Sequence, residues 1–141
     1  MKENVKKEVE KLIENYDLNC SIKEFSDEVD WNKISKYETL SEDFIREFKG
    51  KVNWLYISAL QKLSEDFIRK FKDYVNWDCI SAYQYLSLDF IIELKNKVSW
   101  KYLKEYQNIT KFFDGKIDDL MIFDRVLSSA EIQKFYHQKK I

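Results

Sequence analysis

Residues 40–62 read LSEDFIREFKGKVNWLYISALQK, and residues 63–85 read LSEDFIRKFKDYVNWDCISAYQY. These two stretches are successive copies of one 23-residue unit, and the chain keeps its landmarks in both directions. Tryptophans lie at the same spacing in four copies, at Trp31, Trp54, Trp77 and Trp100. An unvarying period of this length is the sequence signature of a protein built from stacked structural repeats.

Each copy is expected to form two short helices. The first begins after a serine, at Ser41, Ser64 and Ser87 in successive copies. The second begins at the tryptophan, directly after Asp30, Asn53, Asn76 or Ser99. These residue types favour helix starts because a side-chain oxygen accepts a hydrogen bond from an otherwise unpaired backbone N–H. In the second helix we expect Trp54, Ile57 and Leu60 to share one apolar face, and we expect the tryptophans to belong to the core.

The segments on either side of the clear copies predict caps for the array. Residues 3–16 form an amphipathic helix, residues 18–39 hold a degenerate first copy, and a partial further copy starts at Thr110. We therefore predict an all-α protein whose helical hairpins stack as a small solenoid. Its expected domains are an N-terminal capping helix at 1–17, helical repeats at 18–113 and a divergent C-terminal cap at 114–141.

Composition excludes several classes of protein. Lys and Arg number 24 against 25 Asp and Glu, a formal net charge of -1, whereas a DNA-wrapping protein is strongly basic. No apolar run approaches the roughly 18 residues of a membrane span. The first residues, MKENVKKEVEK, contain no apolar core of a secretory signal. We expect a protein of the cytoplasm of a bacterial host, with no membrane association.

The residue types that carry catalysis are sparse. Cys20 and Cys79 lie in no Cys/His cluster, so we expect free thiols and no zinc site. The single histidine, His137, lies in a polar terminal run, and nothing places it in a catalytic triad. The carboxylates of Asp114, Asp118 and Asp119 could bind a divalent cation, although a solvated turn is the favoured interpretation. We expect no enzyme activity, no cofactor and no metal.

Residues 113–136 read FDGKIDDLMIFDRVLSSAEIQKFY, which resembles the C-terminal end of a laminin-G/concanavalin A-like lectin domain. The resemblance rests on the FDG and IDD motifs, an apolar stretch and a final helix that ends near a tyrosine. It implies a β-sandwich lectin, but the many strands of that fold have no counterpart in the preceding repeats. The segment is therefore not expected to bind sugar by itself.

Two groups of residues are candidates for binding a partner. Lys33, Tyr56, Cys79 and Tyr102 occupy one repeat position, where the side chain differs between copies. Varied side chains beside constant scaffold residues are typical of binding repeats, and relaxed constraint on a solvated face would give the same pattern. Leu88 and Ile92 replace the Glu and Arg of the other copies and lie four residues apart, which makes one apolar stripe. We expect this stripe to be covered by the C-terminal tail, or else by a partner or a second copy of the chain.

These observations favour a non-catalytic protein-binding module. The short repeats and lectin-like tail are similar to those of phage or prophage accessory proteins. A phage-encoded inhibitor of a bacterial defence complex, such as an anti-CRISPR protein, is the specific hypothesis. The alternative is a nucleic-acid-binding repeat protein whose aromatic rings stack on bases. That alternative needs a basic track, which ends where Ile92 follows Arg46 and Arg69. A structural or lectin-related surface protein is a third possibility.

Overall fold

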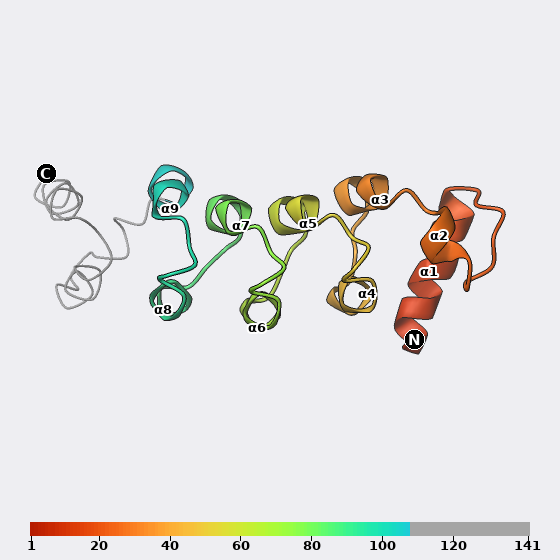
Figure 1. The fold of residues 1–141 in the computed structure, drawn as a ribbon, viewed down its shortest axis with the longest axis horizontal. Coiled ribbons are helices and arrows are strands. Elements are labelled where there is room, and N and C mark those ends of the chain that lie inside the picture. Colours follow the sequence, from red (N-terminus) through yellow and green to blue (C-terminus); the bar gives the residue numbers. More distant parts are fainter. Residues whose placement is uncertain (108–141) are drawn as a thin grey trace, which may run out of the picture. The chain divides into compact units, whose positions relative to one another are not determined.

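The computed structural model describes residues 1–107, which contain nine α-helices and no strand (Figure 1). The chain divides into two compact units, Met1–Val75 and Asn76–Ile141, and the second is described as far as Gln107. The first unit contains α1 (Glu3–Asn15), α2 (Phe25–Glu28), α3 (Trp31–Tyr37), α4 (Glu42–Glu47), α5 (Trp54–Leu60) and α6 (Glu65–Lys70). The second contains α7 (Trp77–Tyr83), α8 (Leu88–Glu93) and α9 (Trp100–Tyr106).

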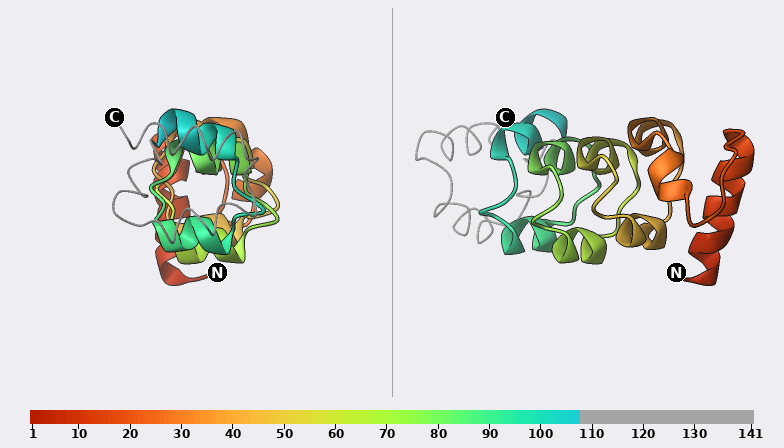
Figure 2. Two further views of the ribbon diagram at one scale, coloured as in Figure 1. Left: turned by 90° about the vertical axis from the view of Figure 1, so that its left-hand side faces the viewer. Right: turned by 45° about the vertical axis from the view of Figure 1, so that its right-hand side comes forward.

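The predicted all-α repeat fold is confirmed. Two kinds of helix alternate along the chain: tryptophan-led helices (α3, α5, α7 and α9) and serine-capped helices (α4, α6 and α8). Tryptophan-led helices of consecutive copies pack against each other, α3 against α5 in the first unit and α7 against α9 in the second. Figures 1 and 2 show α3 beside α5, with α4 and α6 forming a second row below them. The divergent C-terminal cap predicted at 114–141 lies outside the described residues.

The core takes the same side chains from each copy. Every serine-capped helix buries a phenylalanine and the isoleucine after it, and every tryptophan-led helix buries one aliphatic side chain four positions into the helix. The fully buried set is Phe44, Ile45, Phe67, Ile68, Phe90, Ile91, Ile34, Ile57, Ile80 and Leu103. A short helix has room for only two or three such inward positions, so each copy depends on its neighbours to complete its core.

The tryptophans are half-buried, which corrects the expectation that they belong to the core. The Trp54 ring packs toward the next serine-capped helix, with its centroid 5.6 Å from that of Phe71. Its indole N–H donates a 2.9 Å hydrogen bond to the carbonyl of Lys49 in the preceding turn. Trp31 makes the same bond to Ser26 and Trp100 to Lys95. One face of the indole therefore packs against the neighbouring aromatic ring, and its N–H edge holds a surface turn in place by a hydrogen bond.

The N-terminal helix α1 acts as a cap on the first unit. It buries Val5, Val9 and Leu12 and packs against α4. From α1, the carboxylate of Glu8 accepts hydrogen bonds from the Ser41 backbone N–H at 2.9 Å and from its hydroxyl at 2.6 Å. Glu8 therefore gives Ser41 the acceptor that a preceding serine-capped helix would give.

The predicted helix caps are present. Ser64 Oγ accepts from the Phe67 N–H at 3.2 Å, and Asn76 Oδ1 accepts from the Cys79 N–H at 3.0 Å. Ser41 and Ser87 cap their helices in the same way, whereas Ser99 makes no side-chain capping bond.

Replacing Ser64 with alanine is expected to lower the free energy of unfolding by about 0.5–2 kcal/mol, because the cap of α6 is lost. The serine also donates to Glu42, so Glu42→Ala separates the two roles: it keeps the capping serine and removes that acceptor. Urea denaturation followed by circular dichroism measures both variants. Unfolding of Ser64→Ala at the wild-type urea concentration would show that neither contact stabilises the fold.

Candidate binding surface

Three kinds of hydrogen bond join consecutive copies, and each uses a residue that recurs every 23 positions. The first joins serine-capped helices: Glu42 accepts from the N–H of Ser64 at 2.8 Å and from its hydroxyl at 2.9 Å. The second joins tryptophan-led helices: the Asn53 N–H donates to Ser35 Oγ at 3.0 Å, and the Ser99 N–H donates to Ser81 Oγ at 2.8 Å. The small serines at this position are buried and act as hydrogen-bond acceptors.

The third kind of bond uses a glutamine that the sequence reasoning missed. Gln61 Nε2 donates to the carbonyls of Ser35 and Glu38 at 3.2 and 2.7 Å, and its Oε1 accepts from the Leu40 N–H at 2.9 Å. Gln107 likewise donates to the carbonyls of Ser81 and Gln84 in the second unit. The signal was visible, because Gln61, Gln84 and Gln107 follow the repeat period. These glutamines satisfy carbonyls that a helix end leaves unpaired.

The equivalents of Leu88 and Ile92 in α4 face the next copy. They are Glu42, which holds the next capping serine, and Arg46, whose guanidinium lies 5.3 Å from the Phe67 ring centroid. Arg46 also forms ion pairs with Asp43 at 2.8 Å and with Glu42 at 3.7 Å. Both Leu88 and Ile92 are half-buried in α8. The residues expected to cover them in the C-terminal tail lie outside the described residues, so that expectation stays a prediction.

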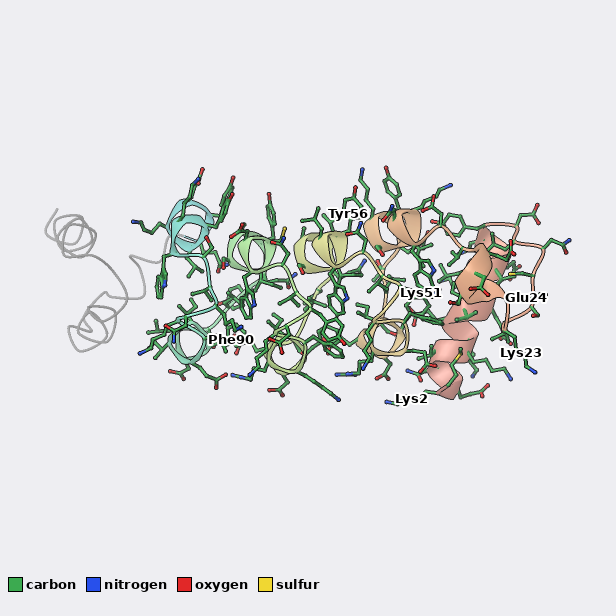
Figure 3. All side chains as sticks on the ribbon, in the orientation of Figure 1. Lys2, Lys23, Glu24, Lys51, Tyr56 and Phe90 are labelled. Atoms are coloured by element: carbon green, nitrogen blue, oxygen red, sulfur yellow. The ribbon has the colours of Figure 1, made fainter. Side chains whose placement is uncertain are left out.

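The other predicted binding residues share one place on the tryptophan-led helices. Lys33, Tyr56, Cys79 and Tyr102 each stand third in their helix. Lys33 is exposed, while Tyr56 (Figure 3), Cys79 and Tyr102 are half-buried. Because Leu88 and Ile92 belong to a serine-capped helix, the two predicted groups lie on different kinds of helix.

The last residue of each tryptophan-led helix was missed as a candidate. These residues are large and exposed: Tyr37 by 67%, Leu60 by 56%, Tyr83 by 61% and Tyr106 by 52%. Leu60, expected on the apolar face with Trp54, points outward because six residues are about one and two-thirds helical turns. Each lies four residues after a predicted binding position, so the two sets share one outer helix face. The 23-residue spacing of these four positions was the sequence signal that could have identified them.

In the first unit, lysines lie over the tyrosines of this outer face. Lys36 Nζ is 5.1 Å from the Tyr37 ring centroid and 5.6 Å from that of Tyr56. Lys33 Nζ lies 5.2 Å from the Tyr16 ring, at the end of α1. These distances are within the range of cation–π attraction, which fixes both the cation and the rings.

Tyr16 is also held by a carboxylate. Its hydroxyl donates a 2.6 Å hydrogen bond to Glu38. That bond, followed by burial and the charge of Glu38, raises the pKa of Tyr16 from 10.0 to about 12. Because the pKa in the folded chain is the higher one, the contact's contribution to stability is complete below about pH 10. It is lost as the pH rises through about 12.

An ultraviolet titration of phenolate formation tests this contact. The difference between wild type and Tyr16→Phe is expected to show one tyrosine that ionises near pH 12. In a Glu38→Gln background, the same difference is expected to move toward pH 10, because the hydrogen bond to a charged acceptor is lost. If Tyr16 of the wild-type protein already ionised near pH 10 in this comparison, the result would contradict its contact with Glu38.

In the second unit, three tyrosine rings lie close together, and no lysine stands at the position of Lys36. The Tyr106 ring centroid lies 5.9 Å from that of Tyr83 and 5.9 Å from that of Tyr102. We call Tyr83, Tyr102 and Tyr106 the tyrosine patch. Lys101 lies 5.5 Å from the Tyr102 ring. The pKa of Tyr106 is raised, first by the charge of Glu105, then by burial and by the other two tyrosines.

The carboxylates of one hollow in the first unit are engaged in hydrogen bonds. A hollow of about 320 Å³ beside α1 contains the carboxylates of Glu8 and Glu38, but these hold Ser41 and Tyr16. Within residues 1–107 no three His, Cys, Asp or Glu side chains come together as a metal site. Cys20 and Cys79 are free thiols, and burial is the first cause that raises each pKa. The aspartates at 114, 118 and 119 and His137 lie outside the described residues.

No helix in the described part of the chain is long and apolar enough to cross a lipid bilayer. The lectin-like segment at 113–136 lies beyond Gln107, so its resemblance stays a prediction.

Comparison of the chain with protein-family models, curated proteins and solved structures finds no match in any of the three.

Proposed function

We propose that the chain is a non-catalytic protein-binding module built from helical repeats. The observation that carries the proposal is the exposed side chain at the end of each tryptophan-led helix. The first unit exposes Tyr37 and Leu60 there, and the second exposes Tyr83 and Tyr106. Clusters of exposed aromatic and apolar side chains mark protein interfaces, in which tyrosine is enriched.

The residues that are constant between copies support the same proposal, because they are the ones that hold the copies together. The recurring Glu, Ser and Gln side chains are engaged in hydrogen bonds between copies, as Glu42, Ser35 and Gln61 show. The outer face of the tryptophan-led helices carries none of these contacts. Its side chains can therefore differ between copies without loss of the array, which suits a surface that recognises a partner.

Affinity capture from a bacterial lysate, with mass spectrometry and nucleic-acid staining, tests the proposal. The variant replaces four outer residues with serine: Tyr37, Leu60, Tyr83 and Tyr106. The matched control replaces Glu47 and Lys70, which are exposed on serine-capped helices, with alanine. We expect a defined protein to be captured by wild type and control and lost from the variant, with all three equally folded. Capture that survives the four serines would contradict the proposal.

Nucleic-acid binding is the second candidate, because Lys33, Lys36 and Lys101 all lie beside tyrosine rings on which bases could stack. A gel shift with single-stranded DNA and RNA at rising salt separates it from protein binding. Phosphate contacts make affinity fall steeply with salt. A shift that is abolished at high salt and in the four-serine variant would favour this candidate.

Within the protein-binding class, we propose a partner in a bacterial defence complex, which the chain would inhibit in the manner of an anti-CRISPR protein. The small chain, its short repeats and its lectin-like tail support this choice. A phage-plating assay in bacteria with an active CRISPR system tests it. Expression of the chain is expected to restore phage growth, and the four-serine variant is expected to fail.

A further inference from the structure

Two tyrosines from consecutive tryptophan-led helices hold a cation in the first unit. Lys36 belongs to α3 and lies near the rings of Tyr37, on its own helix, and Tyr56, on α5. Because α3 and α5 pack directly together, the copies themselves create this pair of rings. The arrangement is a cation site that the chain fills with its own lysine.

The second unit repeats the rings but lacks that lysine. Counting two repeat steps from the first unit, Tyr83 stands for Tyr37, Tyr102 for Tyr56, and Ala82 for Lys36. The helices that carry them, α7 and α9, pack together as α3 and α5 do. Tyr106 adds a third ring within 5.9 Å of both. In the tyrosine patch a methyl group therefore stands at the position of Lys36, and Lys101 lies beside Tyr102.

Glu105 places one negative charge next to the patch. Glu105 precedes Tyr106 in α9 and is exposed. Its negative charge is the first cause of the raised pKa of Tyr106. Lys101 beside Tyr102 shows that this ring accepts an ammonium group. Among residues 1–107 no cation lies over Tyr83 or Tyr106, which are 61% and 52% exposed.

We propose that the tyrosine patch, with Glu105, binds a lysine or arginine side chain of a protein partner. The inference rests on the proposed function and names the chemistry that the partner presents. An arginine suits the patch best, since its planar guanidinium stacks on tyrosine rings and pairs with a carboxylate at the same time. A nucleic-acid strand suits it less, because Glu105 repels the phosphates that would flank a stacked base.

Nuclear magnetic resonance titration of the full chain tests the inference with defined probes. The probes are the blocked peptide Gly-Arg-Gly, the same peptide with uncharged citrulline in place of arginine, and hexathymidylate. We expect the arginine peptide to shift the ring signals of Tyr83, Tyr102 and Tyr106, and the other two probes to leave them unchanged. Tyr106→Leu should weaken binding of the arginine peptide by about two- to fivefold, the amount that one exposed ring contributes to the affinity. Glu105→Gln should weaken it and reduce its salt dependence.

A reciprocal exchange supplies the sharpest control. Ala82→Lys places in the second unit the lysine that the first unit has, and it should block peptide binding at the tyrosine patch. Lys36→Ala empties the first-unit site, and new peptide-induced shifts should appear at Tyr37 and Tyr56. Tyr85→Leu alters the 94% exposed tyrosine of the second unit and should leave peptide binding unchanged.

Equal shifts with citrulline, tighter binding of hexathymidylate than of arginine, or undiminished binding by Ala82→Lys would each overturn the inference. Failure of the inference and failure of the proposed function are distinguishable. If the lysate capture still identifies a protein that the four-serine variant loses, while the arginine peptide leaves the rings unshifted, only the partner chemistry is wrong.

Discussion

Replacement of Phe67 with alanine is expected to lower the free energy of unfolding by about 3–5 kcal/mol, the usual cost of deleting a fully buried aromatic ring. Phe67 has no exposed surface. Its ring lies 4.6 Å from that of Phe71 and 6.3 Å from that of Trp54, measured between centroids, and the Arg46 guanidinium covers it. The alanine variant therefore leaves a cavity where two consecutive copies meet.

Urea denaturation monitored by tryptophan fluorescence measures this loss, because Trp54 reports directly on the site. Phe67→Leu is the matched control and should lose much less, since leucine refills most of the volume. Tyr85→Ala is the surface control, because it removes an aromatic ring that is already 94% exposed. An alanine variant at position 67 that unfolds like the Tyr85 variant would refute the assignment of this ring to the core.

Replacement of Gln61 with glutamate is expected to destabilise the fold strongly at neutral pH. The Gln61 side chain is only 5% exposed and donates to two carbonyls. A carboxylate has no proton to donate, and its negative charge repels the two carbonyl oxygens. Each buried polar group left without its partner costs about 1–3 kcal/mol, and burial of the charge adds to this.

The pH dependence of this variant gives a second readout. Burial among carbonyls should raise the pKa of the new carboxyl above that of the unfolded chain. The protonated form can donate a hydrogen bond again, so the deficit relative to wild type should shrink as the pH falls below that raised pKa. Urea denaturation at pH 4 and pH 7 compares wild type, Gln61→Glu and the exposed control Lys62→Glu. An equal deficit at both pH values would contradict the carbonyl contact.

Local signals predicted the helices well. The caps at Ser64 and Asn76 are formed within three residues, so the sequence around each helix start contains everything that the cap needs. The contacts of Gln61 span 21 to 26 residues, and no local rule points to them. Only their recurrence with the repeat could have revealed them.

The candidate site was predicted in part. Tyr56 and Tyr102 were singled out because their position varies, and both lie on the outer helix face. Tyr37 and Tyr83 lie one helical turn after Lys33 and Cys79. They were missed because large apolar residues at helical spacing are usually assigned to the core. In helices of seven residues the inward stripe is narrow, and the last position already faces outward. The sequence pattern alone does not contain that geometric fact.

The bond between Glu8 and Ser41 has a consequence for how such a chain can change length. Glu8 offers Ser41 the carboxylate that Glu42 offers Ser64. If residues 41–63 were excised as a block, Ser64 would arrive beside Glu8 and find the acceptor that Ser41 had. The gene can thus lose or gain the module of residues 41–63 by unequal recombination while the junction at Glu8 stays chemically matched. The number of binding positions is then a heritable variable, set separately from the chemistry of any one of them.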